Sequence, residues 1–414
     1  MPASSNRVIA ISAIILARLT KQEQSFLTFG MAPTSTATWF QGEGAVPILH
    51  NRIESIVKAN PWLTGNLVKK DGNLHIAYNS TTENIDNIFQ VVHDDSIRDD
   101  IPLEILAKKC SYLLLQPHQD LHQPFWKVVV VPCPGGRFLV LVSMSHVVGD
   151  GHSFYSLYNM LMGGQKVKAL QVNRVHSTQD QQQEALGAAE ANVMTSIGLV
   201  VSVLRGFFLS RVVAPILRRK DLQVASRFLL VDEIKMTALK ETAAHSVPFV
   251  STNDVITSWF LRNCKCPRGL MMLNFRGRLQ DHTVDLAGNY ENCLYYRRED
   301  FATPALIRQS LQNLKRVVTA DHPIRSSDMA WQHVGVCTNW ASFCSSDVRL
   351  PNCHVLAHLP LYDVKATTPS TMTMCIIFQA RPQQLGLLIL GTPEKLQHLS
   401  KAPFEADEPF VLEH

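Results

Sequence analysis

The sequence has little net charge and few charged residues of any kind. Its 414 residues include 39 lysines and arginines against 35 aspartates and glutamates, and charged residues make up 18% of the chain. An average domain has roughly 25%. A net charge of +4 is too small to predict binding to nucleic acid. Because hydrophobic residues reach 46%, a globally disordered chain is excluded as well.

Cysteine is also sparse. The nine cysteines are an odd number in a long chain, which favours a reducing compartment over a disulfide framework, with one or two bridges left open. We therefore expect a cytoplasmic protein. No Cys-x-x-Cys pair occurs, and neither Cys264 with Cys266 nor Cys353 with His354 and His358 has the spacing of a zinc site. No metal is expected, and His354 and His358 are interpreted as a surface pair.

Several catalytic signatures are missing. The chain has no Gly-x-x-x-x-Gly-Lys-Ser/Thr loop and no Gly-x-Gly-x-x-Gly turn, which argues against P-loop and Rossmann nucleotide sites. It also lacks the Gly-x-Ser-x-Gly elbow of α/β-hydrolases.

Two apolar runs resemble targeting or membrane segments. Val8–Ala17 has the length of a signal-peptide core but no clear cleavage site, so we expect a buried first strand. Val193–Leu217 is long enough to span a bilayer, but Arg205 and Arg211 interrupt it. We expect a buried or channel-lining helix there. An exposed amphipathic helix with weak membrane contact through 193–217, and hence a membrane-associated protein, remains the alternative.

The length predicts two domains. The mixed periodicities predict an α/β protein. Residues 170–191 are poor in large apolar side chains, which is typical of a linker.

Individual segments have clear local signatures. The clearest expectations are a helix over 47–59, a hairpin turn at Asp71-Gly72, adjacent buried strands over 126–132 and 138–144, a capped helix over 251–263, a helix over 301–320, and strands over 374–379 and 385–390.

The most informative motif is the run SHVVGDG at residues 145–151, which follows an apolar strand and precedes a helix. A histidine on the loop leaving a strand can face a cleft, and imidazole suits general-base chemistry near neutral pH. Asp150 lies close enough to fold the loop back, and Gly149 and Gly151 are expected to supply positive φ angles. A satisfied histidine in a tight turn is the structural alternative.

This motif resembles the His-x-x-x-Asp-Gly signature of the chloramphenicol acetyltransferase-like acyltransferases, which include BAHD acyltransferases, alcohol acyltransferases and condensation domains. Further segments resemble family elements in the expected order: NPWLTGNL at 60–67, PFW at 124–126, VSTNDVITSWF at 250–260, LNFRGRL at 273–279 and GN at 288–289. Condensation domains usually carry a second histidine where this chain has Ser145, which favours the BAHD-like and alcohol acyltransferases.

The resemblance implies a two-lobed α/β fold with the active site in a tunnel between the lobes. The N-terminal lobe would cover residues 1–185, a linker and crossover helix residues 186–219, and the C-terminal lobe residues 220–414. It implies an acyltransferase of secondary metabolism in which His146 is the general base and Asp150 holds the loop. The acyl group would pass from a thioester, acyl-coenzyme A as co-substrate, to a hydroxyl or amine of a small-molecule acceptor. No bound cofactor and a monomer are expected. A condensation-type enzyme using a carrier-protein thioester, or a non-catalytic ligand-binding relative, is the alternative.

Residues of the second half receive roles from the resemblance alone. Thr338, in a Thr-Asn-Trp run, would donate a hydrogen bond to the oxyanion, and a capping threonine beside a core tryptophan is the alternative. Asn274, Arg276 and Arg278 belong to the Asn-x-Arg-x-Arg element, which would place both arginines near the domain interface, with plain surface charge as the alternative. Asp363 stands where the family has its Asp-Phe-Gly-Trp-Gly motif, of which only the aspartate is kept, and is the expected partner of Arg278. With Gly151, these residues complete the expected site.

Overall fold

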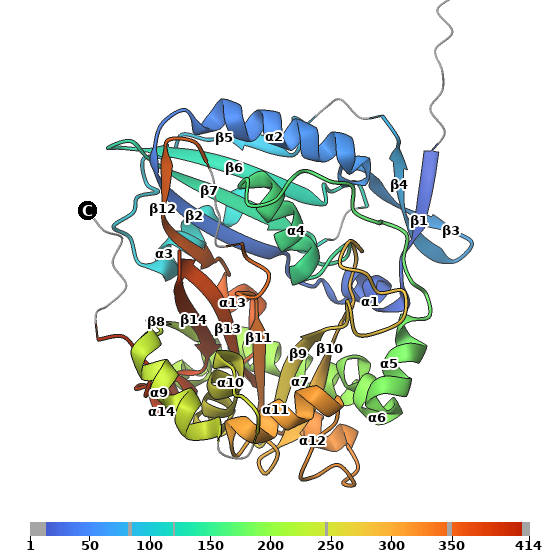
Figure 1. Cartoon of the computed structure of the whole chain (residues 1–414), viewed down its shortest axis with the longest axis vertical. Coiled ribbons are helices and arrows are strands. Elements are labelled where there is room, and N and C mark those ends of the chain that lie inside the picture. The colour runs from blue at the N-terminus through green and yellow to red at the C-terminus, as the bar shows by residue number, and fades with distance from the viewer. Residues whose placement is uncertain (1–13, 82–84, 119–120, 245–246, 346–349, 408–414) are drawn as a thin grey trace, which may run out of the picture.

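The computed structural model describes residues 14–81, 85–118, 121–244, 247–345 and 350–407. Most of their strands belong to two large sheets, one in each half of the molecule in Figure 1. This is the mixed α/β architecture that the sequence predicts. Of the expected first strand, residues 8–13 lie outside the described residues. The rest lies in strand β1 (Ile14–Arg18), where Ile14 is exposed rather than buried.

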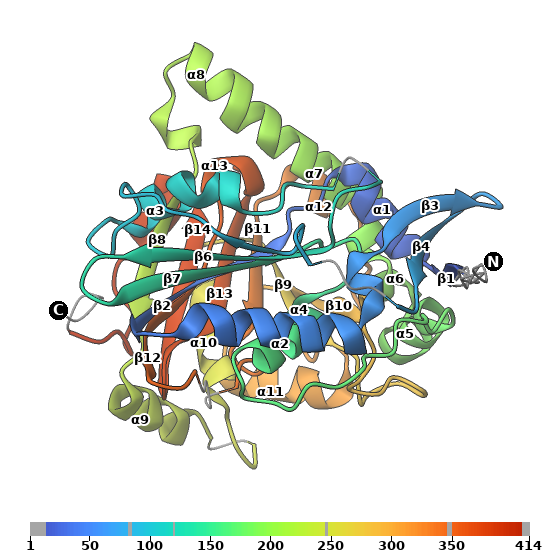
Figure 2. The same ribbon diagram turned by 90° about the horizontal axis from the view of Figure 1, so that it is seen from above.

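The first sheet has the order β12-β2-β7-β6-β5. Its strands from the first half of the chain are β2 (Thr34–Gly42), β5 (Phe89–Val91), β6 (Trp126–Cys133) and β7 (Arg137–Met144). The two predicted buried strands are confirmed as β6 and β7, an antiparallel pair. Helices α2 (Ala45–Ala59) and α4 (Gly151–Leu161) lie on one face and α3 (Leu103–Cys110) on the other (Figure 2).

The second sheet has the order β10-β9-β11-β13-β14-β8. Its strands are β8 (Ala225–Leu230), β9 (Arg268–Asn274), β10 (Glu291–Arg297), β11 (Val334–Asn339), β13 (Met372–Arg381) and β14 (Gln384–Gly391). Its neighbouring helices are α9 (Glu233–Ala243), α10 (Thr252–Asn263), α11 (Pro304–Asn313), α12 (Ser326–Trp331) and α14 (Pro393–His398). The predicted helix cap is confirmed, because Ser251 and Asp254 form a reciprocal capping box.

The helix expected over residues 301–320 is shorter than predicted. It ends at Asn313 because Leu314 adopts a left-handed conformation, with φ of 51°. The predicted hairpin is confirmed: β3 (Asn66–Lys70) and β4 (Asn73–Asn79) flank the Asp71-Gly72 turn in a small third sheet with β1.

One strand of the first sheet comes from the second half of the chain. Strand β12 (Cys353–Pro360), orange in Figure 1, pairs antiparallel with the blue β2. The two halves are thus tied by main-chain hydrogen bonds. The division at residues 185 and 220 stays a prediction that does not account for β12. His358 lies on this strand and is buried, so its interpretation as a surface residue is wrong.

The segment between the halves is not a plain linker. It contains α5 (Thr178–Leu186), α6 (Ala188–Ala191) and α7 (Ile197–Phe208), which continues through a π-helical turn (Leu209–Val213) into α8 (Ala214–Ile216). Among the described residues, Ile197–Ile216 is one helix of 20 residues, apolar and long enough to cross a membrane. The expectation of a buried helix is wrong, because only 28% of its apolar window is buried.

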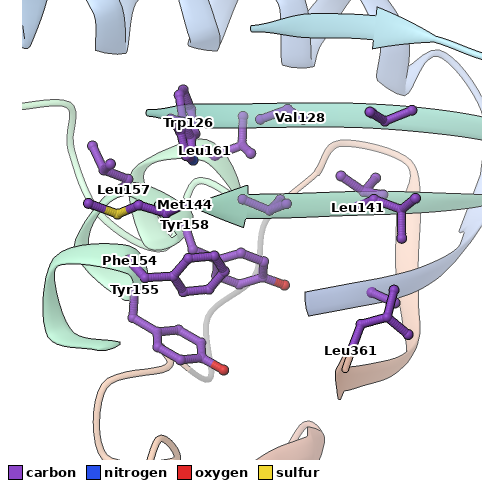
Figure 3. Close-up of a cluster of buried hydrophobic side chains, with 14 of the residues drawn as sticks. Trp126, Val128, Leu141, Met144, Phe154, Tyr155, Leu157, Tyr158, Leu161 and Leu361 are labelled. Carbon is purple, nitrogen blue, oxygen red and sulfur yellow. The ribbon is translucent and has the colours of Figure 1, made fainter. Parts of the chain in front are cut away.

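Helix α4 is fixed against the first sheet by a dense apolar cluster. Figure 3 shows Phe154, Leu157 and Leu161 of α4 beside Trp126 of β6 and Met144 of β7, and all of these side chains are buried. Burying aromatic and aliphatic side chains of this size stabilises the folded state by about 1.5–3 kcal/mol each. The start of α4, where the motif loop ends, is therefore held rigidly against the end of β7.

Candidate active site

The motif loop, residues 145–150, connects the end of β7 to the start of α4. The amide of Ser145 donates to the carbonyl of Phe125 at 2.8 Å, which fixes the loop to the segment before β6. Gly149 and Gly151 do not have positive φ angles, so that expectation is wrong. Gly149 is required for another reason. A Cβ there would lie 2.3 Å from the Cε of Met144 and 2.8 Å from the Cβ of Ser153, because the loop packs tightly on α4.

His146 occupies a partly exposed position with both ring nitrogens facing polar groups. Its Nδ1 lies 3.1 Å from Oδ1 of Asn289, and the Nδ2 of Asn289 donates to the His146 carbonyl at 2.9 Å. Because the amide nitrogen is used by that carbonyl, Oδ1 faces the ring as an acceptor. Nδ1 therefore carries the proton in the neutral imidazole, and Nε2 carries the lone pair. The ring packs edge-on against Phe26.

Glu291 faces the basic nitrogen. Its Oε1 lies 3.6 Å from Nε2 of His146, and both side chains are about four-fifths buried. Burial raises the pKa of the Glu291 carboxyl, and the charge of His146 opposes this rise. When ionised, Glu291 attracts a protonated imidazole electrostatically. The sequence predicts no role for Glu291, because nothing in its local pattern distinguishes it from another strand residue.

Asp150 does not contact His146 and instead anchors the loop. Its carboxylate accepts from the amides of Ser153 and Tyr290 at 2.9 and 3.0 Å, and caps the N-terminus of α4. It also forms a buried two-pronged ion pair with Arg276, at 2.7 and 3.2 Å. Burial alone would raise the pKa of Asp150, but the guanidinium and the hydrogen bonds outweigh it and hold the pKa at about 2.

This ion pair joins the two large sheets. Asp150 follows β7 of the first sheet, whereas Arg276 follows β9 of the second. Arg276 also donates to the carbonyls of Leu286 and Gly288, at 3.0 and 2.9 Å. Asn274 supports it, since its Oδ1 accepts from Arg276 N and Nη1, both at 3.1 Å. The site is thus built at the junction of the sheets.

A second buried ion pair lies behind His146. Glu23 of α1 (Lys21–Phe29) pairs with Arg174, and both side chains are fully buried. Arg174 donates to the carbonyl of Val148 at 2.9 Å. Oε1 of Glu23 accepts from the main-chain N–H of Asn289 at 3.1 Å and from its side-chain Nδ2 at 3.3 Å. The pair therefore positions both the motif loop and the amide that orients the histidine. A Thr20-x-x-Glu23 capping pattern is visible in the sequence, but it signals only a helix start.

The other expected site residues have mixed outcomes. Gly151 is the first residue of α4, and a Cβ there would lie 3.7 Å from the Trp340 ring nitrogen. Thr338 lies half-buried in β11, and its role stays a prediction. The expected pairing of Arg278 with Asp363 is wrong. Both are exposed, and no ion pair joins them in the described part of the chain. Arg278 follows Gly277 in a turn and is exposed. The inward-facing arginine of this element is Arg276, which is buried.

His358 of β12 belongs to a separate buried cluster, in which it contacts α4 further from the motif loop. Its ring nitrogens lie 2.9 Å from the Thr38 hydroxyl, 3.0 Å from that of Tyr158 and 3.0 Å from that of Tyr155. Burial lowers the pKa of His358 to about 3, so this imidazole is neutral. Within the described ranges, no three histidine, cysteine or acidic side chains gather in a metal-binding arrangement.

We expect Asp150→Ala to be strongly destabilising, because it leaves the Arg276 charge buried without a partner. Such changes typically cost about 3–5 kcal/mol. The matched control is Arg278→Ala, which should stay within about 0.5 kcal/mol. Denaturant unfolding measures both, and a loss at Arg278 as large as that at Asp150 would contradict the assignment. Because the pKa of Asp150 is lowered, its contribution should be lost as the pH falls below about 4.

Glu291→Gln should stabilise the folded protein, unlike Asp150→Ala. The raised pKa of Glu291 means that folding disfavours its charged form, so the folded state is penalised at pH values above that pKa. Substitution should therefore raise the thermal midpoint at pH 7 to 8, and the gain should vanish below about pH 4. Glu299→Gln, at an exposed position after β10, is the control and should change little at either pH. A pH-independent gain would contradict the burial argument.

No family model matches the chain, and no curated protein does either. Solved structures match over nearly the whole length. The first condensation domain of the calcium-dependent antibiotic synthetase aligns with a TM-score of 0.61 and 13% identity, over 94% of each chain. TRI101 of F. sporotrichioides, complexed with coenzyme A and T-2, aligns with a TM-score of 0.59 and 13% identity, over 94% of this chain and 97% of that one.

A third match is polyketide synthase associated protein 5 from Mycobacterium tuberculosis, with a TM-score of 0.54 and 13% identity, over 92% of this chain and 95% of that one. At such low identity the likeness concerns the fold. The mixed α/β fold of this chain is thus that of the condensation domains and of TRI101.

Proposed function

We propose that the protein is an acyltransferase that moves an acyl group from a thioester to a hydroxyl or amine of a small-molecule acceptor. The observation that carries this proposal is the orientation of His146. Its Nδ1 is bonded to Asn289, which leaves the lone pair of Nε2 on the side of the ring facing Glu291. A neutral imidazole with one nitrogen fixed and the other available is arranged for general-base catalysis.

The reaction proceeds by direct transfer. Nε2 of His146 takes a proton from the acceptor hydroxyl or amine as that group attacks the thioester carbonyl. The resulting tetrahedral oxyanion collapses, the carbon–sulfur bond breaks, and the imidazolium returns the proton to the leaving thiolate. No covalent acyl-enzyme is needed, because one base serves both proton transfers. Ionised Glu291 stabilises the imidazolium, and the Thr338 hydroxyl is the proposed donor to the oxyanion.

Acyl-coenzyme A is the proposed donor. The TRI101 structures of the same fold are complexed with coenzyme A, which supports this choice. Asp150 takes no part in proton transfer in this scheme, because its carboxylate is occupied by Arg276, Ser153 and Tyr290. It is a positioning residue that keeps the loop between the sheets.

His146→Ala should lower the rate of acyl transfer by about 10²–10⁴-fold while leaving the thermal midpoint nearly unchanged compared with Asp150→Ala, because no ion pair between buried charges is broken. Transfer is measured as thiol release from acyl-coenzyme A with and without a panel of alcohols and amines. His354→Ala, an exposed histidine on β12, is the matched control and should retain full activity. Full activity in His146→Ala, or a loss of fold equal to its loss of activity, would refute the proposed role.

Asn289→Ala tests, in the same assay, whether Asn289 orients the imidazole of His146. If Asn289 acts by orienting the imidazole, this variant should lose about 10²-fold in kcat with KM nearly unchanged. A change in KM alone would mean that Asn289 contacts a substrate instead.

A condensation-type reaction on a carrier-protein thioester is the second candidate. The match with the calcium-dependent antibiotic synthetase domain favours it. Thiol release is measured in parallel with acyl-coenzyme A and with an acylated carrier protein. The thioester that is turned over identifies the donor. A catalytically idle, ligand-binding relative would turn over neither, yet would still be stabilised thermally by acyl thioesters that bind its native state.

A further inference from the structure

The helix Ile197–Ile216 has mostly small residues against the protein, together with Leu199, and several of its large residues outside. Gly198, Ser202, Gly206 and Ala214 are buried. A Cβ at Gly198 would lie 2.1 Å from the carbonyl oxygen of Ser326, and one at Gly206 would lie 2.5 Å from Oγ1 of Thr371. The helix is therefore pressed against the body of the protein more closely than larger residues would allow.

Hydrogen bonds hold this inner face in place. The hydroxyl of Thr371 donates to the carbonyl of Ser202 at 2.8 Å, and the hydroxyl of Ser370 donates to the carbonyl of Gly206 at 3.0 Å. The helix is thus a docked part of the folded protein. Because its inner face is hydrogen-bonded to the body at Ser202 and Gly206, the docked helix cannot also span a bilayer.

The opposite side of the helix and its tip form what we term the outward face. This face consists of Ile197, Leu204, Phe208, Val212, Ile216 and Leu217, whose side chains are between 41% and 73% exposed. The first four recur at intervals of seven and four residues, which places them on one side of a helix. An ordinary surface helix turns its large apolar residues inward, so this arrangement is reversed. In Figure 2 the helix leans out from the body, with α8 at its far end.

The charge of this segment has one sign. Residues 191–220 contain no aspartate or glutamate, and their charged residues are Arg205, Arg211, Arg218, Arg219 and Lys220. Arg219 pairs with the following Asp221, whereas Arg218 and Lys220 are exposed beside it. The Arg205 guanidinium lies 5.3 Å from the ring centre of Trp331, an exposed tryptophan of the adjoining α12. Exposed apolar, aromatic and cationic side chains together are typical of a membrane interface.

We propose that the outward face docks on the surface of an anionic lipid bilayer, with its apolar side chains at the acyl boundary and Arg211, Arg218 and Lys220 among the headgroups. The excess of cationic residues in a segment whose positions 191–220 include no aspartate or glutamate matches a negatively charged lipid surface. The apolar face supplies the hydrophobic part of the binding free energy. This inference rests on the helix alone and is independent of the proposed acyl transfer.

Vesicle co-sedimentation tests the proposal with the full chain. The protein should bind vesicles of phosphatidylcholine mixed with phosphatidylserine, bind poorly to phosphatidylcholine alone, and be released by high salt. The double variant Leu204→Glu, Phe208→Glu should bind at least about tenfold more weakly, as should Arg218→Glu, Lys220→Glu. Ile234→Glu, an exposed apolar position on α9, is the matched control and should bind like the unmodified protein.

Every substituted side chain is exposed, so we expect all variants to fold. Their thermal midpoints check this. The proposal is overturned if the unmodified protein fails to bind the anionic vesicles or if the Leu204 and Phe208 variant binds them equally well. It is also overturned if the protein forms a dimer that this variant dissolves and that shows no affinity for vesicles, because the occupant would then be a second copy of the chain.

Discussion

Two charged residues from different halves of the chain, Asp150 and Arg276, form the contact on which the site depends. Each would be costly to bury alone, and together they are tolerated because nearly every hydrogen-bonding position is used. Asp150 also caps α4, whose apolar side is packed into the first sheet. The position of the second sheet relative to the motif loop is therefore fixed at the residue that ends the motif.

The second ion pair extends this arrangement to the histidine. Glu23 and Arg174 are both remote in sequence from the motif, yet they bond to Asn289 and to the carbonyl of Val148 on either side of His146. The imidazole is oriented by an amide that is itself held by a buried carboxylate. Such support would matter for the proposed general base, because proton transfer requires the correct tautomer facing the reacting group. The contacts around His146 thus form a network that fixes one ring nitrogen and leaves the other facing Glu291.

The pairing of β12 with β2 also fixes the two halves of the chain relative to each other. Because β12 is hydrogen-bonded to β2 along its length, the sheets cannot separate without breaking a strand pair. His358 on β12 is bonded in turn to hydroxyls of Thr38 and of α4. Helix α4 is consequently held by the first sheet, by Arg276 at its start and by β12 further along, which makes it the rigid element against which His146 is positioned.

The sequence alone determined much of the local structure of this protein. Strands β6 and β7, helix α2 and the capping box at Ser251 follow from periodicity and from side chains that bond to their own helix ends, so neighbouring residues suffice to predict them. The motif at residues 145–151 likewise singled out His146 and Asp150 from neighbouring residues, and their roles in catalysis stay a prediction. Only the tertiary structure decided which distant groups meet there. Asn289, 143 positions from His146 in sequence, faces it because two sheets meet, and Arg276 rather than Arg278 turns inward because a turn at Gly277 separates them. The exposed side of the helix at 197–216 was likewise undecidable from composition, since an apolar helix is compatible with a core, and the close approach of Gly198 and Gly206 to the body leaves its large residues outside.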